Sequence, residues 1–398
     1  MEQQSFPDLG VSKPVVRALE RRGIIAPFAI QSMVVPDGIA GHDVLARSRT
    51  GSGKTLAFAL PIVERLDPKA PRPSALILVP TRELAVQVAE EFEEIAKVKG
   101  LSAAAAYGGV SITAQSKAVG RANVLIATPG RLDDLIRRRL VKLNEVRILV
   151  LDEADRMLDM GFLPQVSRIV KHVPADRQTM FFSATLDGEV ARIATSYTRN
   201  PRRHEIHSDT PVVEEAEHRF LSVQSGNKVD ALVKLLRENE GRTLVFVRTK
   251  RGADRLVEKL KTRGLKVVAM HGDMGQPARQ RALERFEAGK VDTLVATDVA
   301  ARGLDLDAIT HVINFDPPSD HKDYVHRVGR TARAGRTGVG VTLVQPSEEG
   351  DVSRIASRLR LQEEFKESGM RMAKPQVVYA STRGRKSLLY RPPRRTRV

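Results

Sequence analysis

The sequence has 398 residues, of which 41% are hydrophobic and 28% charged, values typical of folded globular proteins and not of disordered ones. At roughly 150 residues per domain, this length predicts two or three domains. The absence of cysteine excludes disulfides, thiolate metal sites and a cysteine nucleophile. We also see no apolar run long enough to cross a bilayer and no signal-peptide start, so we expect a cytoplasmic protein without a membrane partner. The net charge of +17, from 65 basic and 48 acidic residues, favours a polyanionic partner.

Short apolar strands alternate with helical stretches along the chain, and this pattern occurs twice. We expect strands in the first half at residues 43–46, 75–79, 123–127, 147–151 and 179–183, and in the second half at 243–247, 266–270, 293–296, 311–314 and 339–344. The clearest helical patterns lie at 55–66, 83–97, 228–238 and 253–263. Continuous apolar strands that alternate with helices predict an α/β fold, in which a parallel sheet is covered by helices on both faces.

A polar break at residues 208–215 separates the two halves of this pattern. We therefore expect two domains, residues 1–207 and 216–370, joined by a short mobile linker at 208–215. Residues 371–398 contain nine basic and no acidic residues, which leaves +8 on residues 1–370. We expect this tail to be a flexible, disordered arm that holds RNA or DNA phosphates in a salt-sensitive way. A solvated tail without a partner is the alternative.

A glycine-rich segment follows the first expected strand and leads into a helix: Ser48-Arg49-Thr50-Gly51-Ser52-Gly53-Lys54-Thr55. Such a loop aims backbone N–H groups and the positive end of the helix dipole at phosphate oxygens. Lys54 is placed to neutralise the β- and γ-phosphates of a nucleotide, and the Thr55 hydroxyl to ligate Mg²⁺. The strict pattern has glycine where this chain has Ser48. A glycine turn before an ordinary helix is the alternative, because Gly-Lys-Thr also occurs by chance in turns.

A second acidic segment supports the nucleotide site. The apolar run Ile148-Leu149-Val150-Leu151 ends in Asp152-Glu153-Ala154-Asp155. The carboxyl ends of parallel strands line one crevice, which is also the edge from which the glycine-rich loop emerges. We expect Asp152 to hold Mg²⁺ through water and Glu153 to polarise the attacking water, since phosphoryl transfer needs positioning and charge neutralisation more than covalent chemistry.

Taken together, the motifs resemble those of the DEAD-box ATP-dependent RNA helicases of superfamily 2, and the resemblance covers residues 6 to about 336. It is carried, in chain order, by Phe6, Gly23, Pro27 and Gln31, the loop at 48–55, Pro80-Thr81-Arg82-Glu83-Leu84-Ala85, Gly108-Gly109, Thr128-Pro129-Gly130-Arg131, residues 152–155, Ser183-Ala184-Thr185, residues 245–249, His271-Gly272, Gln276, Arg279, Ala296-Thr297-Asp298, residues 301–305 and His326-Arg327-Val328-Gly329-Arg330-Thr331-Ala332-Arg333. The resemblance implies two tandem RecA-like domains and an enzyme that hydrolyses ATP.

The resemblance also implies a role for each matching residue. Phe6 and Gln31 correspond to the motif that reads adenine, by stacking and by amide hydrogen bonds. From the second domain, Arg330 and Arg333 would act as arginine fingers and Asp305 would complete the nucleotide contacts. Residues implied to couple hydrolysis to strand separation are Ser183, Thr185, Asp155 and His326. Residues implied to contact RNA phosphates and 2′-hydroxyls are Arg82, Gly109, Thr128 and Arg131 in the first domain and Thr249, Arg279, Thr297 and Arg302 in the second.

This chain departs from the family pattern at three positions. Ser48 stands where the family has Ala or Gly, and Ile24 and Phe28 stand where the adenine motif more often has an aromatic residue and a Ser or Thr. His204 and His207 are expected to be solvated histidines and not metal ligands, because residues three apart on a strand point to opposite faces.

We predict an RNA-dependent ATPase that closes on RNA and unwinds or remodels short duplexes locally. An ATP-gated RNA clamp or annealing chaperone with little unwinding is the alternative, and a DNA helicase is a further one. The expected cofactors are ATP and Mg²⁺, and the expected partner is RNA with little sequence preference. Ribosomal or RNA-decay proteins are candidate partners, and we expect a monomer.

Overall fold

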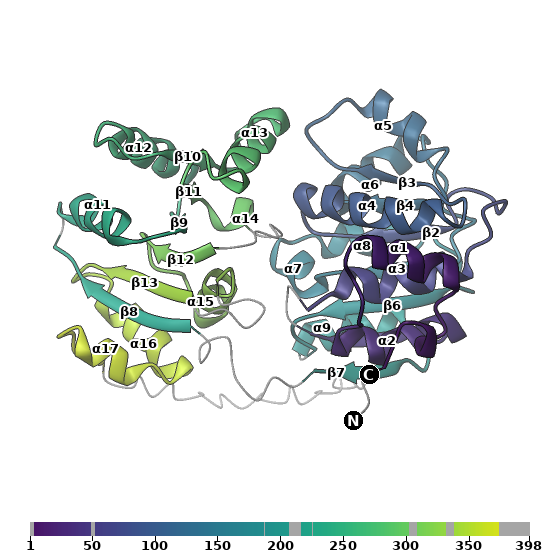
Figure 1. Cartoon of the computed structure of the whole chain (residues 1–398), viewed down its shortest axis with the longest axis horizontal. Helices are drawn as coiled ribbons and strands as arrows, with labels where there is room; N and C mark the ends of the chain where they lie inside the picture. The colour runs from purple at the N-terminus through teal and green to yellow at the C-terminus, as the bar shows by residue number, and fades with distance from the viewer. Residues whose placement is uncertain are drawn as a thin grey trace, which may run out of the picture.

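The computed structural model of the chain shows two α/β domains side by side (Figure 1). It describes residues 4–48, 52–186, 188–206, 216–224, 226–301, 309–331 and 338–373. The predicted linker and residues 374–398 of the basic tail lie outside these ranges, so the expectations for both stay predictions.

The first domain is built on a seven-stranded sheet in the order β3-β4-β2-β5-β6-β1-β7, in which every pair is parallel. The bounds in that order are β3 Ala103–Ala106, β4 Val124–Ala127, β2 Ala75–Leu78, β5 Ile148–Leu151, β6 Gln178–Ser183, β1 Val44–Arg47 and β7 Arg202–Glu205. The five strands predicted for this half are all present, and β3 and β7 add one strand at each edge.

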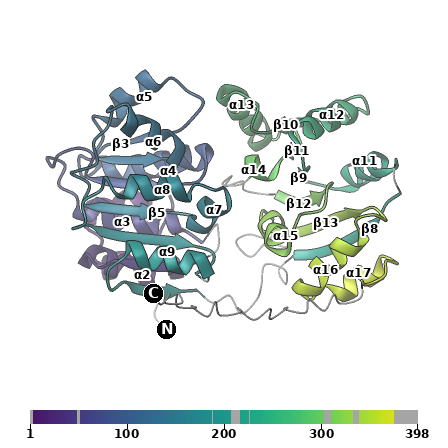
Figure 2. The same ribbon diagram turned by 180° about the vertical axis from the view of Figure 1, so that it is seen from behind.

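Helices cover both faces of this sheet (Figures 1 and 2). They are η1 Pro7–Leu9, α1 Lys13–Arg21, α2 Ala29–Ala40, α3 Lys54–Arg65, α4 Arg82–Lys97, α5 Ile112–Val119, α6 Pro129–Arg137, α7 Ala154–Asp159, α8 Leu163–Val170 and α9 Gly188–Tyr197. Alternate residues of one strand enter different cores: Ile77 joins one apolar cluster, whereas Leu76 and Leu78 join the other. The predicted sheet with two covered faces is therefore confirmed.

The second domain contains a six-stranded parallel sheet in the order β10-β11-β9-β12-β13-β8. The bounds in that order are β10 Val267–Met270, β11 Thr293–Ala296, β9 Arg242–Phe246, β12 Ile309–Asn314, β13 Gly338–Val344 and β8 Ala216–Ser222. Its helices are α11 Lys228–Glu238, α12 Lys250–Lys261, α13 Gln276–Glu287, α14 Asp298–Ala301, α15 His321–Val328, α16 Glu349–Leu359 and α17 Gln362–Glu367. Both sheets with their helices have the RecA-like arrangement that the motifs implied.

The last described residues still contact the second domain. The backbone N–H of Arg371 donates to Glu349 Oε1 at 2.6 Å, and that of Ala373 donates to Ser353 Oγ at 3.0 Å. A variant that removes only the basic tail should therefore end after Ala373, so that these two bonds to α16 are kept.

The two domains face each other through particular elements. In both views, α7 of the first domain and α14 and α15 of the second lie on the facing sides (Figures 1 and 2). Among the helices in the described ranges, none is long and apolar enough to span a membrane.

Candidate active site

The phosphate loop lies between β1 and α3, as predicted. Gly53 precedes α3 with φ 82°, a left-handed conformation that favours glycine. Lys54 is buried, and its Nζ donates to the Ser48 carbonyl at 3.2 Å. The ammonium group is therefore held beside the first residue of the loop. Thr50 and Gly51 lie outside the described residues.

The two remaining loop residues flank Gly53 and Lys54. The Ser52 hydroxyl donates to the Ser48 hydroxyl at 3.1 Å, so the serine that departs from the family pattern braces the loop from within. Thr55 is the second residue of α3 and is half-buried. Its place in the first turn of this helix is where a hydroxyl can reach a phosphate-bound cation.

The acidic segment lies at the same sheet edge as the phosphate loop. The strands β5, β6 and β1 are neighbours and parallel, so Asp152 after β5 and the loop after β1 both leave the carboxyl edge. Asp152 is buried, and burial raises its pKa to about 6, although the charge of Lys54 opposes the shift. A carboxylate buried beside a lysine and a glycine loop is the arrangement that the motifs predicted.

Glu153 lies at the start of α7 in a left-handed conformation, with φ 50°. Its side chain is buried and forms an ion pair with Arg156. Burial would raise the pKa of Glu153, but Arg156, Lys54 and Arg330 outweigh burial and hold the pKa below its ordinary value. Because Arg330 belongs to the second domain, a cation of one half of the chain acts on the predicted water-polarising carboxylate of the other.

Hydrogen bonds join the acidic segment to the segment after β6. Asp155 Oδ2 accepts from the backbone N–H of Ala184 at 3.0 Å, from that of Thr185 at 3.1 Å and from the Thr185 hydroxyl at 3.3 Å. Ser183 is buried at the end of β6, and its hydroxyl accepts from the Thr185 N–H at 3.3 Å. These bonds join the acidic segment to residues 183–185, and the coupling role of these residues stays a prediction.

The predicted adenine residues lie beside the phosphate loop, but in different environments. Gln31 is buried, its Oε1 accepts from the Phe28 N–H at 2.9 Å, and its Nε2 donates to the Gly53 carbonyl at 2.9 Å. Phe6 is 1% exposed and lies in the apolar core of the first domain. The Phe6 ring thus presents no open face to a base in this structure, whereas the Phe28 ring is 62% exposed.

The predicted RNA residues of the first domain surround two arginines. The Arg82 guanidinium fills the space that a side chain at Gly109 would need, and the φ of 87° at this residue also favours glycine. Arg131 Nη1 donates to Gln115 Oε1 at 2.5 Å. The pKa of Arg131 is lowered by burial and by the nearby charge of Arg82, with Asp134 opposing. Thr128, which precedes α6, is buried. These contacts hold two cationic groups close together on the first domain.

Two of the predicted RNA residues of the second domain, Thr249 and Thr297, lie at helix starts. The Thr249 hydroxyl caps α12 by accepting from the Gly252 N–H at 3.0 Å. Thr297 is buried between β11 and α14. Arg302 lies outside the described residues, as do the predicted nucleotide residues Asp305 and Arg333.

Arg279 makes a contact that its predicted role did not include. Its Nη2 lies 2.8 Å from Glu83 Oε1, and both side chains are only 7% exposed. Glu83 is at the start of α4 in the first domain and Arg279 is in α13 of the second, so this ion pair joins the two domains. The sequence contains no local signal for such a pair, because nothing near Glu83 indicates a distant partner. RNA contact by Arg279 stays a prediction.

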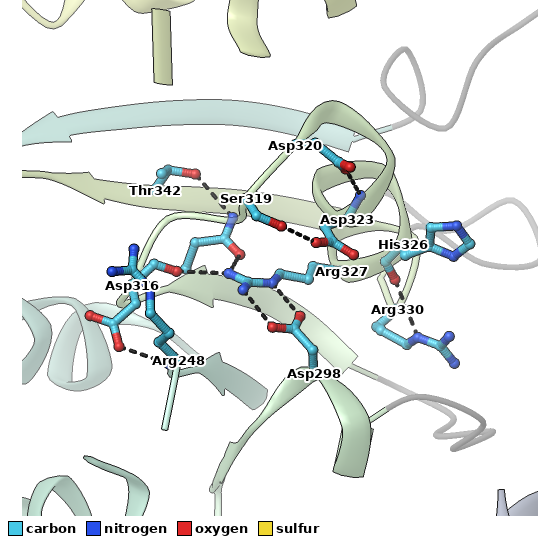
Figure 3. Close-up of polar contacts among 11 residues, drawn as sticks. Arg248, Asp298, Asp316, Ser319, Asp320, Asp323, His326, Arg327, Arg330 and Thr342 are labelled. Carbon is cyan, nitrogen blue, oxygen red and sulfur yellow. Dashed lines mark hydrogen bonds and ion pairs between the residues drawn. The ribbon is translucent and has the colours of Figure 1, made fainter. Parts of the chain in front are cut away.

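A buried arginine organises the facing side of the second domain (Figure 3). Arg327 Nε and Nη2 donate to the two carboxylate oxygens of Asp298 at 2.6 and 2.7 Å. Its Nη1 donates to Asn314 Oδ1 at 3.1 Å and to the Asp316 carbonyl at 2.7 Å, and its guanidinium lies 5.0 Å from the centre of the Phe246 ring. Arg327 therefore fixes α15 to α14 and to the ends of β12 and β9.

Arg330 lies two residues beyond the end of α15. Because Arg327 fixes this helix, it also helps to position Arg330, the predicted arginine finger. Arg330 is 3% exposed, and its Nε donates to the carbonyl of His326 at 3.4 Å (Figure 3). The two residues are four positions apart along the chain, which is about one helical turn. His326 is thus connected to Arg330 through its backbone carbonyl, and the coupling role of His326 stays a prediction.

The two histidines considered as metal ligands are only partly described. His204 Nε2 lies 2.8 Å from Asp37 Oδ2, which links β7 to α2. His207 lies outside the described residues. His204 is therefore paired and only 16% exposed, so the expectation of a solvated histidine is wrong for His204 and stays a prediction for His207.

Comparison with known proteins gives a consistent result for both halves of the chain. Residues 28–193 match the DEAD/DEAH box helicase family, and residues 227–335 match the helicase conserved C-terminal domain. The DEAD-box ATP-dependent RNA helicase CshA of Bacillus subtilis is 41% identical over 353 residues, which are 88% of this chain and 72% of that protein. CshA of Geobacillus kaustophilus is 43% identical over 88% of this chain and 76% of its own length.

A solved structure aligns with both domains at once. The structure of S. cerevisiae Dbp5 bound to RNA and ADP BeF3 has a TM-score of 0.80 and 31% identity, and the alignment covers 91% of this chain and 93% of that one. The fold, the site and these likenesses define the class as a two-domain, nucleotide-dependent helicase. The chain belongs to the DEAD-box ATP-dependent RNA helicases, so the family resemblance of its motifs is confirmed.

Proposed function

We propose that this helicase hydrolyses ATP when RNA holds its two domains together, and that the closed state separates short RNA duplexes locally. The observation that carries this proposal is the buried ion pair between Glu83 of the first domain and Arg279 of the second, which approach to 2.8 Å. The charge of Arg330, which helps to lower the pKa of Glu153, supports it. The likeness to a relative bound to RNA and a nucleotide, over both domains, supports the same arrangement.

Magnesium fits the oxygen groups at the phosphate loop. Among the described residues there is no cluster of three or more His, Asp or Glu side chains for a metal. Mg²⁺ commonly binds through one or two carboxylates together with substrate phosphates and waters, and does not need a protein cage. Asp152 and the Thr55 hydroxyl would hold the ion, which would neutralise phosphate charge when bound.

The chain's own residues perform three tasks in hydrolysis. Lys54 balances phosphate charge at the loop, Glu153 orients the attacking water, and Arg330 stabilises the charge that develops as the bond to the γ-phosphate breaks. Because the low pKa of Glu153 keeps its carboxylate ionised, this group is ready to accept a hydrogen bond from water. Two of these residues are on one domain and one is on the other, so hydrolysis depends on closure.

RNA recognition by these residues is expected to depend on the backbone of the strand. Arginine and hydroxyl groups contact phosphates and 2′-hydroxyls, which carry no base identity. We therefore propose RNA as the partner, with weak sequence preference and a preference over DNA. Both half-sites are on one chain, so we propose a monomer, in the cytoplasm where ATP and RNA meet. Candidate ribosomal or RNA-decay partners stay a prediction.

A strand-displacement assay tests the proposed function. ATP should drive release of one strand from a short RNA duplex, and matched RNA should stimulate ATP turnover more than matched DNA. Annealing or RNA retention without displacement would support the ATP-gated clamp instead. Stronger stimulation by DNA would contradict the choice of RNA.

The interdomain ion pair gives a prediction about closure. Glu83→Arg places a second cation against Arg279, so we expect the apparent affinity for RNA in the presence of ATP to fall by about tenfold or more, because breaking a buried pair is costly. The double variant Glu83→Arg with Arg279→Glu restores opposite charges and should recover much of this affinity.

The same pair of variants separates two roles of Arg279. If Arg279 acts only by contacting RNA, Arg279→Glu remains defective whatever residue stands at position 83. Failure of the charge swap to recover RNA affinity would therefore contradict a closure role for this pair. Thermal unfolding of each variant shows whether the separate domains are intact.

The basic tail gives a second prediction. Truncation after Ala373 should weaken binding to single-stranded RNA and flatten its dependence on salt, by about 0.7 in log–log slope for each phosphate that the tail neutralises in the intact chain. A full-length variant with glutamine at every basic position from 374 onward should show the same change, because the effect comes from charge. An unchanged salt slope in both variants would show that the tail is a solvated segment without an RNA role.

A further inference from the structure

Phe28 is unusually placed for a large apolar side chain. Among the phenylalanine and tyrosine residues in the described ranges, it alone is mostly exposed, at 62%. Its neighbour Ile25 is 79% exposed, so two apolar side chains meet solvent in one short turn before α2. Exposed apolar groups that cluster beside a functional site are commonly part of a binding surface.

The Phe28 ring lies against the phosphate loop. A Cβ added at Gly53 would be 2.6 Å from Phe28 Cδ2, so the edge of the ring contacts the backbone of this glycine. The Phe28 N–H donates to Gln31 Oε1, and Gln31 Nε2 donates to the Gly53 carbonyl, each at 2.9 Å. Backbone and amide bonds thus hold the ring beside the residue that immediately precedes Lys54, where the phosphates of a nucleotide would begin.

The other aromatic candidate near this site does not offer an open face. Phe6 is 1% exposed and surrounded by the core of the first domain. Ile24, which stands where the family more often has an aromatic residue, has no ring to stack. Phe28 stands where the family pattern more often has a Ser or Thr. The chain therefore has an aromatic ring four residues after Ile24, the position at which the family more often has one.

We propose that Phe28 stacks on the nucleobase of ATP and serves as its base platform. The inference rests on the proposed binding of ATP at this loop. A base joined through ribose to phosphates at the loop lies within reach of a ring that contacts Gly53. Stacking is tolerant of base identity because every base has a π-face. Phe28 therefore supplies affinity for the base without selecting adenine, and Gln31 holds the ring in place through its bonds to the Phe28 N–H and the Gly53 carbonyl.

Tryptophan fluorescence tests the proposal directly, because the chain contains no tryptophan. In Phe28→Trp the indole is the single tryptophan, and stacking should quench its emission when Mg²⁺–ATP is added. Tripolyphosphate carries the phosphates without a base and should leave the emission nearly unchanged. Leu140→Trp, at another exposed position, is the matched control and should respond to neither compound.

Steady-state kinetics give an independent measurement. Phe28→Ala should raise the KM for ATP by about tenfold with kcat nearly unchanged, since stacking contributes to binding of the base and not to the chemical step. Phe28→Tyr keeps the ring and should retain the wild-type KM. Binding of tripolyphosphate should be the same in wild type and Phe28→Ala.

Two results would overturn the proposal. Equal quenching by tripolyphosphate and ATP in Phe28→Trp would show a response to the loop and not to a base. Equal weakening of ATP and tripolyphosphate binding in Phe28→Ala would show that the ring only braces the loop. Neither binding measurement depends on turnover, so an enzyme that binds ATP but is not stimulated by RNA would contradict the proposed function and leave the base platform intact.

Discussion

Replacing Glu153 with glutamine is expected to reduce RNA-stimulated ATP turnover by about a hundredfold or more, because the carboxylate that orients the attacking water is removed while the side-chain volume is kept. The residue is buried, is paired with Arg156, and has a pKa held below its ordinary value by Arg156, Lys54 and Arg330. An amide can still accept a hydrogen bond from Arg156 but carries no charge for the water. The measurement is the steady-state rate of phosphate release at saturating RNA and ATP.

The variant should still bind ATP and RNA together, since neither binding step requires hydrolysis. Glu145→Gln, which changes a partly exposed carboxylate of the same domain, is the matched control and should keep the wild-type rate. Turnover by Glu153→Gln at the rate of Glu145→Gln would contradict the assignment of the water-orienting group.

Arg330→Ala is expected to lower kcat by about a thousandfold, which is the low end of the effect of an arginine finger. The guanidinium acts on the charge that forms during phosphoryl transfer, so the KM for ATP should change little. Arg330→Lys keeps the charge but lacks the planar fork, and we expect a smaller but still large decrease in kcat. Single-turnover measurement of ATP cleavage reads this effect without a contribution from product release.

A structural role for Arg330 gives a different outcome. The residue is 3% exposed and contacts His326, so its removal could also disturb the end of α15. In that case the RNA affinity of Arg330→Ala in the presence of ATP would fall together with the rate. Arg281→Ala, at an exposed position of α13, is the control for removal of one positive charge. Unchanged single-turnover cleavage in Arg330→Ala would exclude the finger.

Most of the fold follows from the hydrophobic pattern, and the strands that this pattern misses have physical explanations. The ten predicted strands are all present with small shifts at their ends. The edge strand β3 consists of four alanines, which favour helices, and β7 is Arg-Arg-His-Glu, whose side chains are not fully buried. β8 alternates buried and exposed side chains and directly follows the break at 208–215, so the apolar pattern does not separate it from the turn into the second domain.

In the candidate site, the local sequence predicts some residues, whereas other contacts depend on the tertiary structure. Loop and carboxylate residues such as Lys54 and Asp152 could be predicted, because strand ends and glycine turns determine their positions. The Glu83–Arg279 pair could not, since it depends on how the two domains meet. The sequence shows Phe28 only as a departure from the family pattern, because exposure of a ring is a property of the folded surface. Arg327 belongs to a recognised motif, but its four hydrogen bonds depend on the relative positions of β12, α14 and α15.

The central claim is that ATP and RNA together join two half-sites that are incomplete when apart, and energy transfer between one dye on each domain tests it most directly. The chain has no cysteine, so Glu94→Cys in the first domain and Lys234→Cys in the second, both at exposed positions, provide the only labelling sites. Transfer efficiency should change markedly only when single-stranded RNA and a non-hydrolysable ATP analogue are both present. An efficiency that is unchanged by the two ligands together, or fully changed by either one alone, would contradict the account.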